Sequence, residues 1–501
     1  MKQMFLFVRP PRPLWPFNGP ASSVWPPLAF AALAASLRES VPDLHVAILD
    51  APAIHMGWRS LAAELHRLQP AHVGIGEEAV SCTEGLQLAR LAKGLGAQVI
   101  AGGCFFSHIP NEAIGSGLID VVVHGEGEVT LVELVQSLRS GGARNLRQVR
   151  GISFADGDQI IHSPPRPLIP DLDQLPFPAY DLLPVACYGR GSRNHPDLAA
   201  IELGRGCVGA CQFCVLWRQM GQHRGGAIIP HLRIKSPERL REEVRMLTGK
   251  FQRRYLGWVD PCFNADPQVP GRLAEFMLKE NLRIGQSAWV RADAIVRDAA
   301  SGTLASCVRA GLNEMYLGIE RGDRETLVAL HKTIVPDVSR RALQILARDF
   351  PGVFTVGSFI YGIAGDTPET VRNLRRFASE LTLDYPFFIP LTPLPGTSYW
   401  RPEMWDPTGE RFRKFGFLPG ALGNGRCSAL DKAIIWSDLF QWNRSRLRND
   451  VRAVFHPDAR KRRLTRRLLL RGGAFQARMM FKTMLGRNKG GGMHFPRWYA
   501  S

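Results

Sequence analysis

Three cysteines are the residues of this sequence whose spacing most strongly indicates chemistry. Cys207, Cys211 and Cys214 fall within eight residues, whereas the other six cysteines are scattered singly along the chain. Three thiolates from one loop can ligate three corners of an iron–sulfur cubane and leave the fourth iron without a protein ligand. A structural zinc site needs a fourth ligand, and His223 is the only candidate nearby. The triplet therefore indicates an open iron–sulfur cluster that can bind a ligand.

The cysteine loop opens a repeated strand and helix pattern. Short β-prone runs are followed by helical periodicity in most cases, and strands are expected at 199–203, 255–259, 284–290, 315–319, 353–361 and 386–391. A single helix is expected over 293–310. Six such units in roughly 200 residues predict a partial or full parallel barrel. Barrel active sites lie at the carboxyl ends of the strands, so the cysteines are expected at the catalytic mouth.

A similar alternation occupies the first part of the chain. Strands are expected at 4–8, 45–49, 72–75, 98–100 and 120–123, with helices such as 27–37, 58–68 and 84–95 between them. The pattern predicts an open, doubly wound parallel sheet. Ligands of such sheets bind at the carboxyl strand ends, where the sequence has Gly102, Gly103, Gly125, Glu126, Gly127 and Glu128. The glycines permit close approach of a flat or bulky ligand, and turn glycines without function fit equally well.

Turn signals divide the two blocks. Residues 151–162 predict a hairpin that turns at Asp156 and Gly157, and residues 163–184 are a proline-rich linker. We therefore expect a first domain over 1–145, a hairpin and linker over 146–192, a barrel over 193–405 and a helical basic region over 406–501. In the last region a basic amphipathic helix is expected over 460–485.

Composition predicts a globular protein with an asymmetric charge. The chain has 501 residues, of which 45% are hydrophobic, and it contains no run of about 18 apolar residues. The expected localisation is cytoplasmic. The net charge is +18, and residues 442–501 hold 16 Lys and Arg against two acidic residues. A basic excess confined to one end indicates a local anionic partner or peripheral contact with a membrane surface, and argues against a body built to bind nucleic acid. A solvated tail is the alternative.

The motifs together resemble a known family. The Cys-x-x-x-Cys-x-x-Cys loop with Phe213 before its last cysteine, in a βα barrel, is similar to the radical S-adenosylmethionine (SAM) superfamily. Residues 1 to about 400 resemble the subgroup with an N-terminal cobalamin-binding domain, which includes methylases of unactivated carbon and the anaerobic magnesium-protoporphyrin ester cyclase. Further matching segments are 102–103, 125–128, 175–178, 236–238 and 393–397.

The resemblance implies a fold and a set of cofactors. The first domain would be flavodoxin-like and bind cobalamin, and the second a partial TIM-type (β/α)6 barrel. The cofactors would be a 4Fe-4S cluster, SAM and cobalamin. SAM would chelate the fourth iron, and an electron, supplied by a donor of the flavodoxin or ferredoxin type, would cleave its sulfonium to a 5′-deoxyadenosyl radical.

The resemblance also implies site residues at other barrel strand ends. These are Asp260 to Asn264 near the ligand, Arg291, Glu320 close to the SAM ribose or amine, and the turn from Gly362 to Glu369, which supports adenine. Carboxylates at strand ends suit ribose hydroxyls and an ammonium group, and Arg291 suits a carboxylate. A salt-bridged barrel rim is the alternative interpretation. Cys262 lies beside the expected ligand and is either a donor of a hydrogen atom, a thiol that reacts covalently or a small buried thiol without a role in the reaction.

Two departures from the family pattern limit the assignment. Residues 9–27 contain no histidine, so cobalt would lack the histidine ligand that many cobalamin proteins supply there. The Gly-Gly-Glu segment that many superfamily members use for the SAM amine is replaced after Cys214 by Val215-Leu216-Trp217-Arg218.

Three functions compete. The first is methyl transfer, or related radical chemistry, at an unactivated carbon of a small apolar, tetrapyrrole-like or lipid-like substrate, with the two strand-end faces opposing one another. The second is an RNA-modifying enzyme similar to methylthiotransferases. That family has further cluster cysteines in its N-terminal domain, whereas here Cys82 and Cys104 stand alone. The third is a sensor that binds cobalamin or SAM without turnover. The intact three-cysteine loop argues against it, because a sensor has little need of an open redox-active iron.

Overall fold

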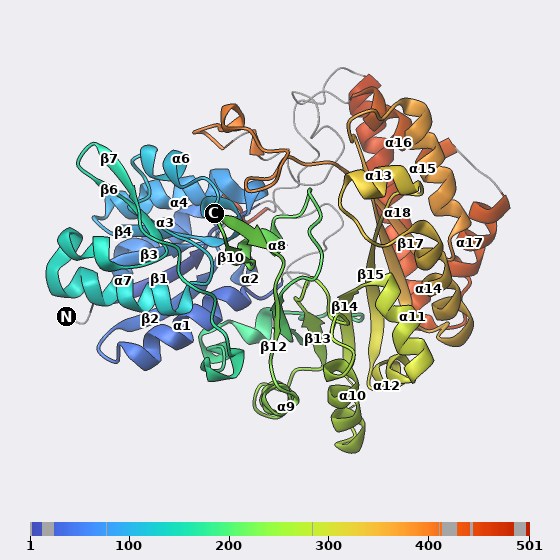
Figure 1. Cartoon of the computed structure of the whole chain (residues 1–501), viewed down its shortest axis with the longest axis horizontal. Helices are drawn as coiled ribbons and strands as arrows, with labels where there is room; N and C mark the ends of the chain where they lie inside the picture. Colours follow the sequence, from blue (N-terminus) through green and yellow to red (C-terminus); the bar gives the residue numbers. More distant parts are fainter. Residues whose placement is uncertain are drawn as a thin grey trace.

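Two parallel sheets with their own helices form the body of the protein (Figure 1). The computed structural model describes residues 3–12, 25–76, 78–282, 284–409, 411–412, 428–440, 444–484 and 497–501. The first sheet and its helices lie beside the second sheet, and the last helices flank the second sheet on its far side (Figure 1).

The first sheet has five parallel strands in the order β2-β1-β3-β4-β5. These are β1 (Met4–Arg9), β2 (His45–Asp50), β3 (His72–Ile75), β4 (Gln98–Ala101) and β5 (Val121–Val123). All five expected strands are confirmed to within two residues. The order reverses direction between β1 and β3, which creates the switch point where doubly wound sheets bind ligands.

Alternating side chains on β1 explain why helices cover both faces of this sheet. Phe5 and Phe7 pack on one face against α1 (Leu28–Ser40) and α7 (Glu128–Gly141). Leu6 and Val8 point to the other face, because side chains alternate along a strand. The helices and short helical turns on the remaining connections are α2 (Ala51–Ile54), α3 (Trp58–Leu68), α4 (Cys82–Gly94), α5 (Gly103–Phe106) and α6 (Pro110–Gly115).

A hairpin extends the first sheet. Its strands β6 (Ile152–Asp156) and β7 (Gln159–His162) are antiparallel, and β6 pairs with β5. The turn consists of Gly157 and Asp158, one residue later than expected, because Asp156 pairs with Gln159. Gly157 has φ 61°, which glycine adopts without the strain of a side chain.

The second sheet has six parallel strands in the order β17-β16-β15-β14-β13-β8. They are β8 (Leu198–Ile201), β13 (Tyr255–Trp258), β14 (Gly285–Val290), β15 (Leu312–Glu320), β16 (Phe354–Tyr361) and β17 (Tyr385–Pro390). The sheet ends at β8 and β17 without closing, so the expected partial barrel is confirmed. Between β8 and β13 lie α8 (Leu216–Gln219) and two antiparallel pairs, β9 (Gly204–Gly206) with β12 (Leu232–Ile234) and β10 (Gln222–Arg224) with β11 (Ala227–Ile229).

Helices follow the barrel strands as expected, with one correction. They are α9 (Pro237–Arg245), α10 (Val269–Lys279), α11 (Ala292–Ser301), α12 (Thr303–Arg309), α13 (Arg324–Ala329), α14 (Pro336–Asp349) and α15 (Pro368–Glu380). The single helix expected over 293–310 is divided into α11 and α12. Gly302 takes φ 80° between them, and a left-handed residue ends a helix.

Three C-terminal helices pack against the barrel. They are α16 (Ala429–Phe440), α17 (Arg444–Val454) and α18 (Ala459–Met484), and α18 confirms the expected basic helix. Near its start, Lys461 Nζ donates to Val353 O at 2.7 Å and pairs with Asp384 at 2.9 Å. The first turns of α18 therefore lie below the amino ends of the barrel strands. None of the helices within the described ranges is long and apolar enough to cross a membrane.

The last described residues return to the first domain. The Trp498 ring stacks on His55, and the Tyr499 hydroxyl donates to Glu84 Oε1 at 2.9 Å. The C-terminal end is therefore in contact with α3 and α4.

Candidate active site

The three-cysteine loop follows β8 and β9 at the carboxyl end of the first barrel strand. The Cys214 amide donates to Cys211 O at 3.1 Å, which folds the loop back on itself. The Sγ atoms of Cys207 and Cys211 each lie 3.8 Å from the point where a Cβ would be on Gly209. Glycine therefore leaves the space beside these two thiols open, and the expected position of the cysteines at the barrel mouth is confirmed.

The surroundings of the three thiols shift their pKa values in different directions. A hydrogen bond from Cys262, whose Sγ lies 3.5 Å from Cys207 Sγ, lowers the pKa of Cys207 below its usual value. Burial raises the pKa of Cys214 to about 11 and also raises that of Cys211. Arg291 and Lys332 act in the opposite direction on Cys211, because nearby cations favour thiolates.

A buried ion pair beside the loop includes Lys332, which the sequence reasoning missed. Lys332 Nζ lies 3.5 Å from Glu320 Oε1, and the Ser358 hydroxyl donates to Glu320 Oε2 at 3.3 Å. Burial raises the pKa of Glu320, and burial alone would lower the pKa of Lys332, but the Glu320 carboxylate and neighbouring thiols raise it. Lys332 follows α13 in a loop without any motif, so only its contact with Glu320 identifies it.

Glu320 is held in an unusual backbone conformation. Its φ is 68°, and the pairing of β15 with β16 shifts register between Gly318 and Glu320. Left-handed non-glycine residues and bulges cost free energy and re-aim side chains, often at functional sites. The shift directs the Glu320 side chain toward Lys332.

Two predicted ligand-binding residues bond to the backbone instead of facing open space. The Asp260 carboxylate accepts from the Leu203 amide at 3.0 Å and from the Gly204 amide at 2.6 Å. Burial raises the pKa of Asp260 to about 7. Asn264 Oδ1 accepts from the Arg291 amide at 2.8 Å. Asp260 thus fixes the strand end that leads to the cysteines, and Asn264 fixes Arg291.

The remaining predicted barrel residues lie in polar turns at the same edge. Arg291 pairs with Asp293 at 2.6 Å and lies close to Cys207 and Cys262. In the turn at Gly362, the Asp366 carboxylate accepts a hydrogen bond from the Gly362 amide at 2.8 Å and forms an ion pair with Arg321 at 2.9 Å. The structure thereby brings Arg291 and Glu320 together around the cysteines.

A cavity of about 540 Å³ lies at the carboxyl edge of the first sheet. Its lining includes Gly102, Gly103, Gly125 and Gly127, and also Leu216 from α8 just after the cysteines. A Cβ on Gly102 would come no closer than 3.4 Å to Val123 O, whereas one on Gly127 would lie 2.8 Å from a methyl group of Leu33. The glycines therefore keep room that side chains would fill, and the cavity borders both domains.

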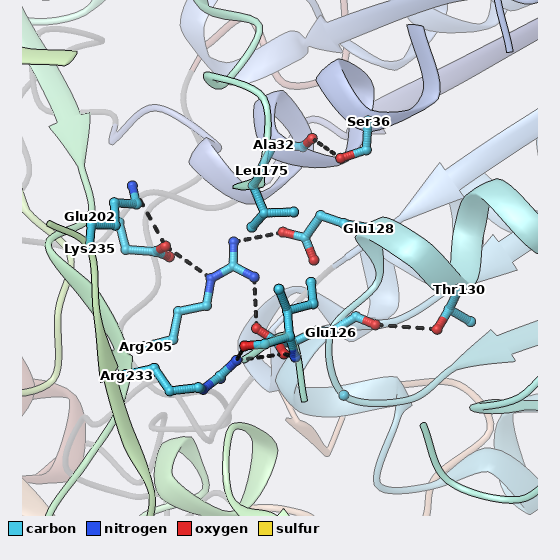
Figure 2. A network of polar contacts seen from close by, with 12 residues as sticks. Ala32, Ser36, Glu126, Glu128, Thr130, Leu175, Glu202, Arg205, Arg233 and Lys235 are labelled. Atoms are coloured by element: carbon cyan, nitrogen blue, oxygen red, sulfur yellow. Dashed lines mark hydrogen bonds and ion pairs between the residues drawn. The ribbon is translucent and has the colours of Figure 1, made fainter. Parts of the chain in front are cut away.

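A buried polar network joins the domains beside this cavity (Figure 2). Arg205, two residues before Cys207, pairs with Glu126 at 2.8 Å and with Glu128 at 2.6 Å. Arg233 pairs with Glu126 at 2.8 Å and donates to Ile169 O at 2.6 Å.

Glu126 holds two arginines in this network, so its role is not limited to contact with a ligand in the cavity. Burial by itself would raise the pKa of Glu126, but Arg205 and Arg233 lower it below its usual value. Both carboxylate oxygens bond to arginines, and Oε2 also accepts the Ile169 amide at 2.7 Å. Sequence reasoning missed Arg205 and Arg233, since their partners lie in another domain.

Buried histidines lie at the same domain boundary. Burial lowers the pKa of His108 to about 4, and His108 contacts Gly396 in the loop after β17. His124 bonds to Ser107 O at 3.0 Å and to Ser153 Oγ at 2.7 Å. His108 therefore packs between the first domain and the barrel, whereas both hydrogen bonds of His124 are within the first domain.

His108 makes stability depend on pH. An unfolded histidine titrates near pH 6.5, so between about pH 6.5 and 4 the unfolded chain binds more protons and stability is lost as pH falls. We expect His108→Gln to lose less unfolding free energy than the wild-type chain between pH 7 and 5, by about 2 kcal/mol. Urea unfolding at both pH values measures this difference, and equal losses would contradict it.

The donor set fits an iron–sulfur cluster with one open iron. Three thiols lie on one loop, with Arg291 and Lys332 as nearby cations. Among the side chains that the structure describes, no three of His, Cys, Asp or Glu converge on one point as ligands of a single ion would. Thiols bound to three separate irons need no such convergence. The glycine-lined cavity likewise fits a large flat cofactor.

Comparison with known proteins finds two family matches in separate parts of the chain. Residues 201–378 match the radical SAM superfamily, and residues 16–135 match the B12 binding domain. An uncharacterised methyltransferase of Pyrococcus horikoshii is 30% identical over 75% of this chain and 78% of its own length. The anaerobic magnesium-protoporphyrin IX monomethyl ester cyclase of Cereibacter sphaeroides is 26% identical over 80% of this chain, which spans 65% of that cyclase.

A solved structure has the same fold. The radical S-adenosylmethionine methyltransferase TsrM from Kitasatospora setae, with tryptophan substrate and a SAM analogue bound, superposes with a TM-score of 0.61. The match covers 82% of this chain and 75% of TsrM at 18% sequence identity. At this identity the likeness establishes the arrangement of the two sheets.

Proposed function

The chain belongs to the cobalamin-dependent radical SAM methylase family, and from this premise we propose that it transfers a methyl group to an unactivated carbon of a small apolar substrate. One observation carries the proposal most directly. The cavity at the carboxyl edge of the first sheet is also lined by Leu216, Gln219 and Met220, which follow the three cysteines. The two strand-end faces therefore meet at one place.

Each cofactor has residues suited to hold it. Cys207, Cys211 and Cys214 would ligate the cluster, and the cavity around Gly102, Gly103 and Gly125 would hold cobalamin. When bound, the cluster supplies an electron for cleavage of SAM and cobalamin carries the methyl group. The electron would come from an external donor of the flavodoxin or ferredoxin type.

The charged residues at the barrel mouth would orient SAM. Arg291 and Lys332 suit its carboxylate, and Glu320 suits its ammonium group or a ribose hydroxyl. The turn at Gly362, which Asp366 and Arg321 hold, would support the adenine. Asp260, Asn264 and Glu126 would act by positioning, because their oxygens bond to backbone amides or arginines.

Exposed aromatic rings support an apolar substrate. Trp289 pairs in register with Tyr316, their ring centroids are 5.0 Å apart, and the Trp289 side chain is 43% exposed. Its neighbours Ala288 and Val290 are buried in the core, so Trp289 faces the concave side of the sheet. Trp25, from the first domain, lies against Gly257 on the adjacent strand. An apolar molecule on this face would gain contact with both rings.

A substitution that fills the cavity tests the proposal. In Gly102→Leu the new side chain enters cavity space without backbone strain, because Gly102 has an extended backbone. We expect the anaerobically prepared variant to retain at least tenfold less corrinoid through gel filtration. It should keep its iron content and its cleavage of SAM under dithionite, and it should lose transfer of isotope label from the SAM methyl group to corrinoid.

Gly115→Leu is the matched control. Gly115 ends α6, no atom lies within 4 Å of its Cβ position, and it does not line the cavity. This variant should bind corrinoid as the wild-type chain does. Normal corrinoid retention by Gly102→Leu would refute the cavity as the cobalamin site, and a wild-type chain that moves no label to corrinoid would refute methyl transfer.

A further inference from the structure

Exposed apolar side chains are concentrated in the C-terminal helices. Of the fourteen exposed large apolar side chains within the described parts of the chain, six lie between residues 436 and 470. Single exposed apolar residues need no explanation, but a concentration of them marks an interaction surface. Trp436 and Phe440 on α16 even contact each other, with ring centroids 4.8 Å apart.

The clearest row runs along α17. Leu447 and Val451 are four residues apart and lie on one side of the helix, and Phe455, the residue after its end, continues the row at the same spacing. The three side chains are 55%, 49% and 71% exposed. The opposite side faces the barrel, because Ala453 is buried and Asn449 Nδ2 donates to Leu381 O at 2.9 Å. The apolar row therefore points away from the protein.

A row of arginines runs beside the apolar row. Arg444, Arg448 and Arg452 have the same four-residue spacing and are exposed. The nearby Asp450 lies 3.5 Å from Arg446, which offsets its charge. Residues 442–501 carry a net charge of +14, so the surroundings are also positive. We call these two rows the α17 outer face, which consists of Arg444, Leu447, Arg448, Val451, Arg452 and Phe455.

We propose that the α17 outer face binds the surface of an anionic phospholipid bilayer. An apolar row can enter the boundary between headgroups and acyl chains while the arginines bind lipid phosphates. A second copy of the chain fits less well, because a symmetric contact would bring the arginine rows together. Figure 1 shows α17 at the outer edge of the molecule, away from the first domain, so docking leaves the site between the sheets accessible.

Vesicle binding by the full chain tests this proposal. We expect co-sedimentation with vesicles of phosphatidylglycerol and phosphatidylcholine, at least tenfold weaker binding to phosphatidylcholine alone, and weakening by salt. Each arginine near an anionic surface contributes about fivefold in affinity, so the triple Arg444→Gln, Arg448→Gln, Arg452→Gln variant should bind on the order of a hundredfold more weakly. The triple Leu447→Ser, Val451→Ser, Phe455→Ser variant should lose at least tenfold.

Matched controls lie elsewhere on the surface. Val328→Ser removes another exposed apolar side chain, and the triple Arg324→Gln, Arg341→Gln, Arg348→Gln variant removes three exposed charges from α13 and α14. Both controls should bind vesicles as the wild-type chain does, and melting temperatures should show that all variants fold. The proposal is overturned if the serine variant binds anionic vesicles normally, or if the chain binds an RNA duplex but not the vesicles.

Discussion

Replacing Cys211 with alanine should abolish the iron–sulfur cluster and with it the cleavage of SAM. Cys211 is the middle thiol of the loop, and a cubane held by two thiolates loses one of its three protein ligands. After anaerobic reconstitution we expect about four irons per wild-type chain and close to none in the variant. Release of 5′-deoxyadenosine under dithionite should fall by about three orders of magnitude or more, because nothing else in the proposed site supplies the electron.

Two other cysteines provide the controls. Cys187→Ala removes a thiol outside the triplet, in the linker before the barrel, and should leave the cluster intact. Cys262→Ala removes the thiol 3.5 Å from Cys207 Sγ and should also retain four irons per chain if Cys262 is only a neighbour. A stable cluster in Cys211→Ala, or its loss in Cys262→Ala, would require a different ligand set.

Arg205→Met should destabilise the protein by about 3–5 kcal/mol, because it leaves buried carboxylates without their partner. Glu128 and Glu126 both bond to Arg205, and all three side chains are at most 8% exposed. Arg233 still pairs with Glu126, whereas Glu128 has no other ion pair within the described residues. Urea unfolding followed by tryptophan fluorescence measures the change in unfolding free energy.

An exposed pair shows how much of that effect depends on burial. Arg245 pairs with Glu280 at 2.8 Å, with side chains 46% and 38% exposed, so Arg245→Met should cost less than about 1 kcal/mol. Adding Glu128→Gln to Arg205→Met should restore part of the lost stability, because a neutral amide costs less to bury than a charge. A loss below 1 kcal/mol for Arg205→Met would show that the domains do not depend on this network.

Local pattern was sufficient to predict most of the fold. Each strand of both sheets lies in a short β-prone run, and the two folds follow from the alternation of such runs with helical periodicity. The position of Cys207 could also be predicted, because the loop that follows a barrel strand lies at the carboxyl edge of the sheet whether or not the barrel closes. The helix break at Gly302 was not predicted, because a glycine within a helical pattern can either be tolerated or end the helix.

The residues that connect distant segments could not be predicted. Arg205 and Glu126 are 79 residues apart, and nothing in either segment specifies how the two sheets are oriented. Lys332 is found only through the bulge that turns Glu320 toward it. The family resemblance implied a place near the ligand for Asp260 to Asn264, and the structure adds that the side-chain oxygens of Asp260 and Asn264 accept hydrogen bonds from backbone amides. Sequence type alone does not separate a residue that binds a ligand from one that holds the loop.

The position of α18 has a consequence for how the chain matures during synthesis. Lys461 pairs with Asp384, and Arg460 lies 3.6 Å from the buried Glu314, so the start of α18 neutralises carboxylates below strands that were translated long before it. Domains generally fold in order as the ribosome releases them. The B12-binding part can form early, but the barrel floor must wait until Arg460 and Lys461 have been translated. Nascent chains arrested before residue 460 should therefore remain sensitive to protease in the barrel while their amino-terminal portion is already resistant.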